Sequence, residues 1–81
     1  MKYTREEVSK HNTQHDCWVV VDDLVLNVSD FMHEHPGGFK VLIKSGGKDV
    51  SNEFHMLHRP DTIQLFAEDC IVGHVDITSR L

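Results

Sequence analysis

The sequence lacks any long apolar segment. Its longest run of aliphatic and aromatic side chains spans only residues 18–21, whereas a helix that crosses a bilayer needs about 20 apolar residues. Residues 1–7 lack the apolar stretch of a signal peptide, and no hydrophobic tail precedes Leu81. These absences lead us to expect a soluble, cytoplasmic domain with no transmembrane anchor.

Cysteine and positive charge are also scarce. Cys17 and Cys70 lie far apart in a chain without a secretion signal, so we expect two reduced thiols. The 8 Lys and Arg residues are outnumbered by 13 Asp and Glu residues, which gives a net charge of −5 with neutral histidines. Nonspecific nucleic-acid binding needs a positive surface and is therefore disfavoured, whereas a basic protein partner is compatible with this charge.

The chain has 81 residues, which indicates one domain over residues 1–81, expected to be a monomer. A domain this short buries only about 60% of the surface of its unfolded chain, so a bound cofactor would add to its stability. What the chain has in unusual number is histidine, with 7 residues. Histidine binds metals and titrates near neutral pH.

Short strands and helices are predicted along the chain. Thr4 and Glu7 fit a capping box that opens a helix ending near residue 11. The β-branched run 18–21, a turn at Asp22-Asp23 and the apolar run 24–28 predict a hairpin buried on both faces.

A central block of helices and a last strand follow the hairpin. Asp49 is a candidate cap for the third of these helices, and Gly46-Gly47 a candidate end for the second. Together the elements predict an α+β fold with helices gathered on one side of a small sheet. The expected helices span residues 31–34, 39–45, 49–54 and 62–68, and the last strand spans residues 71–75.

His35-Pro36-Gly37-Gly38 joins a histidine to a rigid turn. Proline fixes the backbone and has no N–H to donate. The glycines permit a tight turn and let a flat ligand approach the backbone closely. The motif suits an axial metal ligand beneath a planar cofactor, and a helix terminator with a bystander histidine explains it equally well.

A second histidine, His58, ends another helical pattern just before Pro60. If the helices between His35 and His58 fold as two facing hairpins, they form an apolar cleft with one histidine on each wall. Haem, which is apolar across its face and polar at its propionate edge, matches such a cleft. An ordinary apolar core is the alternative explanation for the side chains that would line it, Val41, Leu42, Phe54 and Leu57.

The sequence resembles the cytochrome b5 family over almost its whole length. The motif His35-Pro36-Gly37-Gly38 matches the family's haem signature, and the spacing of Phe54 and His58 resembles the helix of its second ligand. Further similar segments span residues 4–12, 17–20, 26–31, 47–51 and 71–73.

The resemblance implies a small mixed β-sheet with two helical hairpins around a pocket for one haem b. It implies His35 and His58 as axial ligands, which leave the iron no open position for substrate. The protein would then be an electron carrier between a reductase and an electron-accepting enzyme, and not itself an enzyme. The implied cofactor-binding residues are Phe31, Pro36, Gly37, Gly38, Val41, Leu42, Phe54, Leu57, Arg59 and Leu65.

The chain departs from the family pattern at its acidic residues. Acidic residues of microsomal members are replaced here, so the identity of the redox partners stays open. Arg59 stands where a small hydroxyl residue is common, and it either pairs with a haem propionate or remains solvated. The replaced acidic positions hold Phe39, Lys40, Ile43, Lys44, His55 and Met56.

Two other arrangements of the histidines remain open. On a helix, His55 and His58 share a face, so His55 is an alternative ligand. His33, His35, His55 and His58 could instead hold zinc, although structural zinc sites usually include cysteine. A haem-regulated interaction module is a further alternative function.

Overall fold

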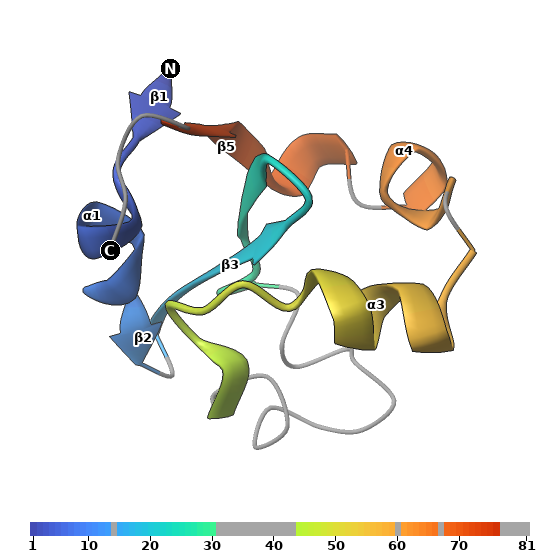
Figure 1. Ribbon diagram of the computed structural model, residues 1–81, viewed down its shortest axis with the longest axis horizontal. Coiled ribbons are helices and arrows are strands. Elements are labelled where there is room, and N and C mark those ends of the chain that lie inside the picture. The colour runs from blue at the N-terminus through green and yellow to red at the C-terminus, as the bar shows by residue number, and fades with distance from the viewer. Residues whose placement is uncertain (14, 31–43, 60, 67, 77–81) are drawn as a thin grey trace.

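A five-stranded sheet is the centre of the fold in the part of the chain that the structure describes. The structure is a computed structural model, which describes residues 1–13, 15–30, 44–59, 61–66 and 68–76. The strand order is β1-β5-β4-β3-β2, and only the β1–β5 pair is parallel (Figure 1). The mixed sheet of the predicted α+β fold is therefore confirmed. Its strands are β1 (Lys2–Tyr3), β2 (Asn12–Thr13), β3 (Asp16–Val21), β4 (Leu24–Asn27) and β5 (Ile71–Val75).

The predicted hairpin is confirmed, with Val20 opposite Val25 in the β3–β4 register. Its turn contains Asp22 at a φ of 56°, in the left-handed region that aspartate tolerates better than most residues. Strand β3 begins at Asp16, two residues earlier than predicted, because Asp16 and Cys17 pair with β2. The short edge strands β1 and β2 carry no pattern that a sequence reader could detect.

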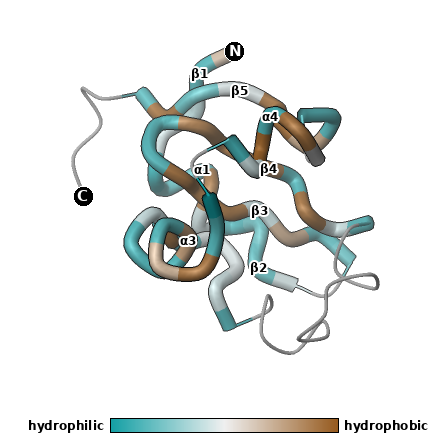
Figure 2. The backbone as a smooth tube through the Cα atoms, turned by 90° about the vertical axis from the view of Figure 1, so that its right-hand side faces the viewer, coloured by the Kyte–Doolittle hydropathy of each residue, from teal (hydrophilic) through white to brown (hydrophobic). Residues whose placement is uncertain are grey.

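The hairpin is buried on both faces, as predicted. Successive strand residues point to opposite faces, so Val20 and Val25 pack in one cluster with Val8 of helix α1 (Arg5–Ser9). Val19 and Val21 pack on the other face. The apolar stretches of β3 and β4 lie at the centre of the molecule (Figure 2).

Helices α3 (Ser51–Leu57) and α4 (Thr62–Phe66) supply the cover of that second face. Phe54 of α3 packs against the cluster, and Ile63 of α4 is buried within it. The later helices thus gather on one face as expected, while α1 covers the opposite face.

The helix boundaries differ by a few residues from the predicted ones. The capping box is confirmed, with the Glu7 N–H donating to Thr4 Oγ1 at 3.0 Å and the Thr4 N–H donating to Glu7 Oε1 at 3.1 Å. Helix α1 stops at Ser9, and α3 continues through Leu57. The last predicted helix divides into α4 and the 3₁₀ helix η2 (Glu68–Cys70).

The segment before α3 is fixed against β3. The Val20 N–H donates to the Lys48 carbonyl at 2.9 Å, and the Val50 N–H donates to the Val20 carbonyl at 2.7 Å. Gly47 has a φ of 76°, and a Cβ there would lie 2.8 Å from the Ser9 carbonyl oxygen, so glycine is required where the chain passes α1. These contacts determine where α3 begins.

The expected cap of α3 is displaced by one residue. Val50, not Asp49, occupies the cap position. The Asp49 carboxylate instead accepts from the Ser51 N–H at 2.9 Å and from the Ser51 hydroxyl at 2.6 Å. Although it precedes the cap residue, Asp49 thus still accepts from the first N–H group of the helix, that of Ser51.

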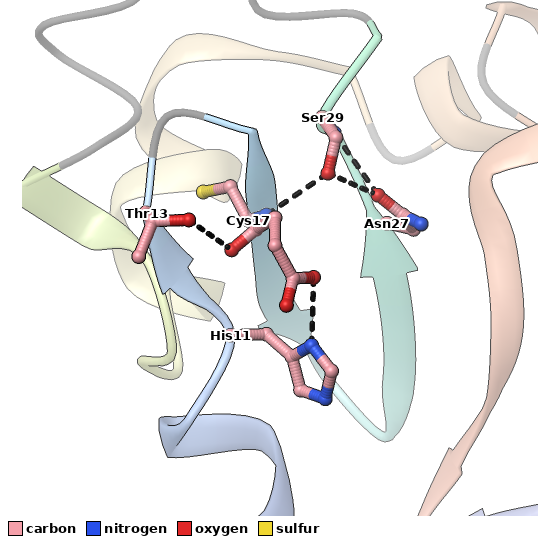
Figure 3. A network of polar contacts seen from close by, with 6 residues as sticks. His11, Thr13, Cys17, Asn27 and Ser29 are labelled. Carbon is pink, nitrogen blue, oxygen red and sulfur yellow. Dashed lines mark hydrogen bonds and ion pairs between the residues drawn. The ribbon is translucent and has the colours of Figure 1, made fainter.

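A polar network closes the other end of the hairpin (Figure 3). The Cys17 N–H donates to Ser29 Oγ at 2.9 Å, and the Ser29 hydroxyl donates to Asn27 Oδ1 at 2.7 Å. The Ser29 N–H donates to the same Asn27 oxygen at 3.0 Å. This network fixes the chain where it leaves β4. The helix expected at residues 31–34, and residues 39–43 of the helix expected at 39–45, lie outside the described residues.

Candidate functional site

His58 marks the end of α3. Its N–H donates to the Phe54 carbonyl at 2.8 Å, but its own backbone is extended, with φ −135° and ψ 154°, so the helix stops here. The residue is exposed. Its imidazole lies against the Phe54 ring, with ring centroids 5.0 Å apart and planes tilted by 34°. Because Phe54 packs on the core, the imidazole is backed by the core and open to a ligand on its free side.

Helices α3 and α4 both carry exposed apolar side chains. Leu57 of α3 is 77% exposed and Leu65 of α4 is 64% exposed. Met56 is 83% exposed. Both helices lie at the same end of the molecule (Figure 1). These side chains leave apolar surface on both helices that the described part of the chain does not bury.

Arg59 follows His58 and is also available to a ligand. Its side chain is 85% exposed, and its Nε lies 3.6 Å from Asp61 Oδ1, beyond hydrogen-bond distance. That oxygen is shielded from solvent and has no hydrogen-bond partner among the described residues. Arg59 and Asp61 thus form an exposed ion pair without a hydrogen bond, and the guanidinium has further N–H donors for an anionic group.

The described residues of the predicted site can be compared with the chemistry of haem. A histidine backed by an aromatic ring provides a nitrogen ligand, and exposed leucines match the apolar face of the macrocycle. Arg59, next to the histidine and in an exposed ion pair with Asp61, carries the guanidinium donors that suit a propionate. The residues therefore fit the cofactor that the sequence predicted.

His55 is placed differently from His58. Its Nε2 lies 3.0 and 3.1 Å from the two carboxylate oxygens of Asp22 in the β3–β4 turn. The resemblance implies His58 as the ligand and leaves His55 as the alternative, and the contact with Asp22 now distinguishes the two.

The other half of the predicted site falls outside the described residues. For its members the predicted placement stays a prediction. They are Phe31, His35, Pro36, Gly37, Gly38, Val41 and Leu42, together with His33 of the alternative zinc site.

Comparison with known proteins agrees with the fold. The family model of the Cytochrome b5-like Heme/Steroid binding domain matches residues 4–76. The chain belongs to this family. The predicted resemblance to cytochrome b5 is thereby confirmed.

Relatives within the cytochrome b5 family cover nearly all of the chain. A cytochrome b5 of Oryza sativa subsp. japonica is 40% identical over 77 residues, which are 95% of this chain and 56% of the rice protein. Cytochrome b5 isoform B of Arabidopsis thaliana is 40% identical over 95% of this chain and 58% of its own length. The chain thus spans somewhat more than half the length of these curated relatives.

A solved cytochrome b5 has the same architecture. The cytochrome b5 of Ostreococcus tauri virus 2 superposes with a TM-score of 0.83 at 39% identity, covering 90% of this chain and 94% of that one. The cytochrome b558 of Ectothiorhodospira vacuolata, at 20% identity and a TM-score of 0.75, supports the fold alone and covers 91% and 96% of the two chains. None of the helices that the structure describes has the length and apolar character needed to cross a bilayer.

The remaining described histidines have positions away from α3. His11 stacks on Trp18, with ring centroids 3.7 Å apart and planes 5° from parallel, and its Nδ1 lies 2.7 Å from Asp16 Oδ1 (Figure 3). His15 and His74 are exposed. Within the described ranges, no three His, Cys, Asp or Glu side chains gather as metal ligands. The alternative zinc cluster includes His33 and His35, which this finding does not test.

The two cysteines are not joined by a disulfide, as expected. Burial, with a smaller contribution from Asp16, raises the pKa of the Cys17 thiol. Burial, followed by Asp69 and Asp30, raises the pKa of the Cys70 thiol. Both thiols are therefore protonated at neutral pH, and Cys70 packs against the core.

Proposed function

We propose that this domain is a small electron carrier that binds one haem b through His35 and His58. The observation that supports the proposal most directly is His58, which is exposed at a helix end and backed by Phe54. An imidazole meant for ordinary core packing would be buried. The family's description names haem and steroids, and an imidazole so presented favours haem.

When bound, the haem supplies one-electron exchange between Fe(III) and Fe(II). If His35 and His58 both held the iron, it would have no position for a substrate, and the haem would serve a carrier and not an enzyme. The chain's own residues exclude water and orient the ligands. Those proposed to line the pocket are Phe31, Pro36, Gly37, Gly38, Val41, Leu42, Phe54, Leu57 and Leu65, with Arg59 at a propionate.

The haem is proposed to be of the b type, held without covalent bonds to the protein. Covalent c-type attachment uses the motif C-x-x-C-H, and neither Cys17 nor Cys70 lies in such a motif. Extraction with acidified butanone should therefore transfer the haem completely to the organic phase. Haem that stays with the protein would contradict the b type.

The partners proposed are a reductase that donates one electron and a redox enzyme that accepts it. One relative at 34% identity is named cytochrome b5 reductase 4 of Xenopus tropicalis, in which the similar region is 14% of the protein. The proposal also comprises one domain over residues 1–81 and a monomer in the cytoplasm. Sedimentation of the haem-loaded chain tests the monomer.

The visible spectrum of purified protein with added haemin tests the ligands. We expect a low-spin, six-coordinate spectrum with sharp bands after dithionite in the wild type. His35→Ala and His58→Ala should each lose it, while His74→Ala, which removes an exposed histidine of β5, should keep it. A wild type that forms no stoichiometric low-spin complex would contradict haem binding, and zinc content would then be measured.

A further inference from the structure

His55 of α3 contacts the hairpin turn as well as its neighbour Phe54, whose ring centroid lies 5.5 Å from that of the imidazole. Its Nε2 lies within hydrogen-bond distance of both carboxylate oxygens of Asp22, so one N–H is shared between the two oxygens. Both side chains are partly exposed, and an exposed pair contributes little to stability. What the contact does determine is the direction in which the imidazole of His55 points.

Asp22 is itself attached to the start of the same helix. Its N–H donates to Ser51 Oγ at 2.6 Å, and the Ser51 hydroxyl donates to Asp49 Oδ1 at 2.6 Å. Ser51 and His55 are four residues apart and therefore lie on one face of α3. The turn thus holds the helix at two points of one face, which prevents rotation about the helix axis.

The rotation of α3 determines the position of the residues that follow it. Phe54 and His58 are joined by a backbone hydrogen bond and by ring contact. We propose that Asp22 holds His55 on the hairpin turn so that α3 presents only His58 to the haem. His55 is then a positioning residue and not a second candidate ligand. The inference deepens the proposed function and rests on it for the role of His58.

The test variant is Asp22→Gly, with Asp23→Gly as its matched control. Glycine adopts the positive φ of position 22 without strain, so this variant removes the carboxylate and keeps the turn. Asp23 is exposed in the same turn, and its carboxylate makes no hydrogen bond or ion pair to the residues that the structure describes. Asp23→Gly therefore adds the same flexibility to the unfolded chain as Asp22→Gly but keeps the contact between Asp22 and His55.

Spectra with haemin distinguish positioning from a purely structural role. His58→Ala should be high-spin, because Asp22 retains His55. His58→Ala with Asp22→Gly should regain a low-spin fraction, and adding His55→Gln should abolish that fraction. The proposal would be overturned if His58→Ala alone were low-spin and became high-spin on addition of His55→Gln, because His55 would then reach the haem despite Asp22. It would also be overturned if the double variant, His58→Ala with Asp22→Gly, stayed high-spin.

Haem release provides a second measurement on the intact ligand set. Transfer of haem to excess apomyoglobin should be faster in Asp22→Gly than in Asp23→Gly, because release of α3 from the turn loosens the position of His58. His55→Gln retains a donor toward Asp22 and should release haem at the wild-type rate, unlike His55→Ala. Equal rates in the two glycine variants would overturn the proposal.

Amide hydrogen exchange in the haem-free protein separates this inference from the proposed function. The N–H groups of Phe54 and His58 should exchange severalfold faster in Asp22→Gly than in Asp23→Gly. If the wild type binds no haem, the proposed function fails, and unchanged exchange at these amides would overturn the attachment of α3 as well. If the wild type binds haem but exchange is unchanged, only the attachment fails.

Discussion

The hairpin sheet and the α3–α4 end of the molecule differ in how they are stabilised. The sheet buries valines on both faces, and Val8, Val20 and Val25 are almost fully inaccessible. Helix α3 has no buried residue, and it exposes Met56 and Leu57. Helix α4 attaches to the core through Ile63 but exposes Leu65. The apolar side chains of the sheet are thus buried by other parts of the chain, whereas several apolar side chains of α3 and α4 remain exposed to solvent.

This difference indicates where a bound cofactor acts. A ligand that covers exposed leucines adds buried apolar area only at the helical end. Regions with few buried contacts open at low free-energy cost, and regions with many open only on global unfolding. Four experiments test this difference in stability between the sheet and the α3–α4 end, and they follow in order of decreasing expected effect.

Haem binding should stabilise the folded protein by about 4 kcal/mol when free haemin is in 1,000-fold excess over its Kd. Hydrogen exchange should slow first and most at α3 and α4, because their apolar side chains become covered. The sheet amides, already protected, should slow only as global unfolding becomes rarer. Equal slowing of local exchange in both regions would contradict the comparison.

Val25→Ala should destabilise the protein by about 2 kcal/mol, because it removes two methyl groups from a filled interior. The loss should be the same in the haem-free and haem-bound forms, as Val25 packs on the face covered by α1. Urea denaturation of both forms measures it. The matched control, Val72→Ala at a half-buried site in β5, should cost less. If Val25→Ala lowered the free energy of unfolding in only the haem-free or only the haem-bound form, the stability of the sheet would depend on the α3–α4 end.

Asp49→Asn should destabilise the protein by about 1 kcal/mol at neutral pH. Burial alone would raise the pKa of Asp49, but hydrogen bonds from Ser51 and pairing with Arg5 outweigh it and lower the pKa. The Arg5 guanidinium lies 3.5 Å from the carboxylate. Since the folded pKa is below the unfolded one, the contribution is complete above about pH 4 and is lost as the pH falls through the folded pKa.

Chemical denaturation across pH tests this assignment, with Asp23→Asn as the control. The stability difference between wild type and Asp49→Asn should shrink toward zero in acid. A difference that grows as the pH falls would show that the carboxylate destabilises the fold.

Leu57→Ser should change the stability of the haem-free protein by only about 0.5 kcal/mol or less, because the side chain is already exposed. The haem-bound form should lose haem faster than wild type. Met56→Ser, an equally exposed change on the same helix, serves as the control and should leave release unchanged. Faster release from both variants would show that the haem covers both side chains, and no change in either would remove Leu57 from the pocket.

Local patterns were sufficient for the elements whose stability comes from nearby residues. The capping box needs only Thr4 and Glu7, three positions apart, and the hairpin needs a β-branched run followed by a turn. Both were predicted and are observed. The ends of helices were predicted less well, since the last turn of a helix depends on what it packs against.

Contacts between distant segments escaped sequence reasoning. The edge strands β1 and β2 form because β5 and β3 offer unpaired backbone groups, and two residues carry no periodic signal of their own. The contact between Asp22 and His55 spans 33 positions. The paired aspartates predicted a turn, but nothing local indicated that one of them would accept from a helix.

The hairpin, its burial on both faces, and the choice of His58 and its neighbours as haem candidates were all predictable, because they follow from residue chemistry and short-range spacing. The contacts of His58 with Phe54 and of His55 with Asp22 became visible only in the folded chain. The physical reason is that helical spacing only places the two histidines on one face. Their surroundings, which come from residues far away in the chain, make them different.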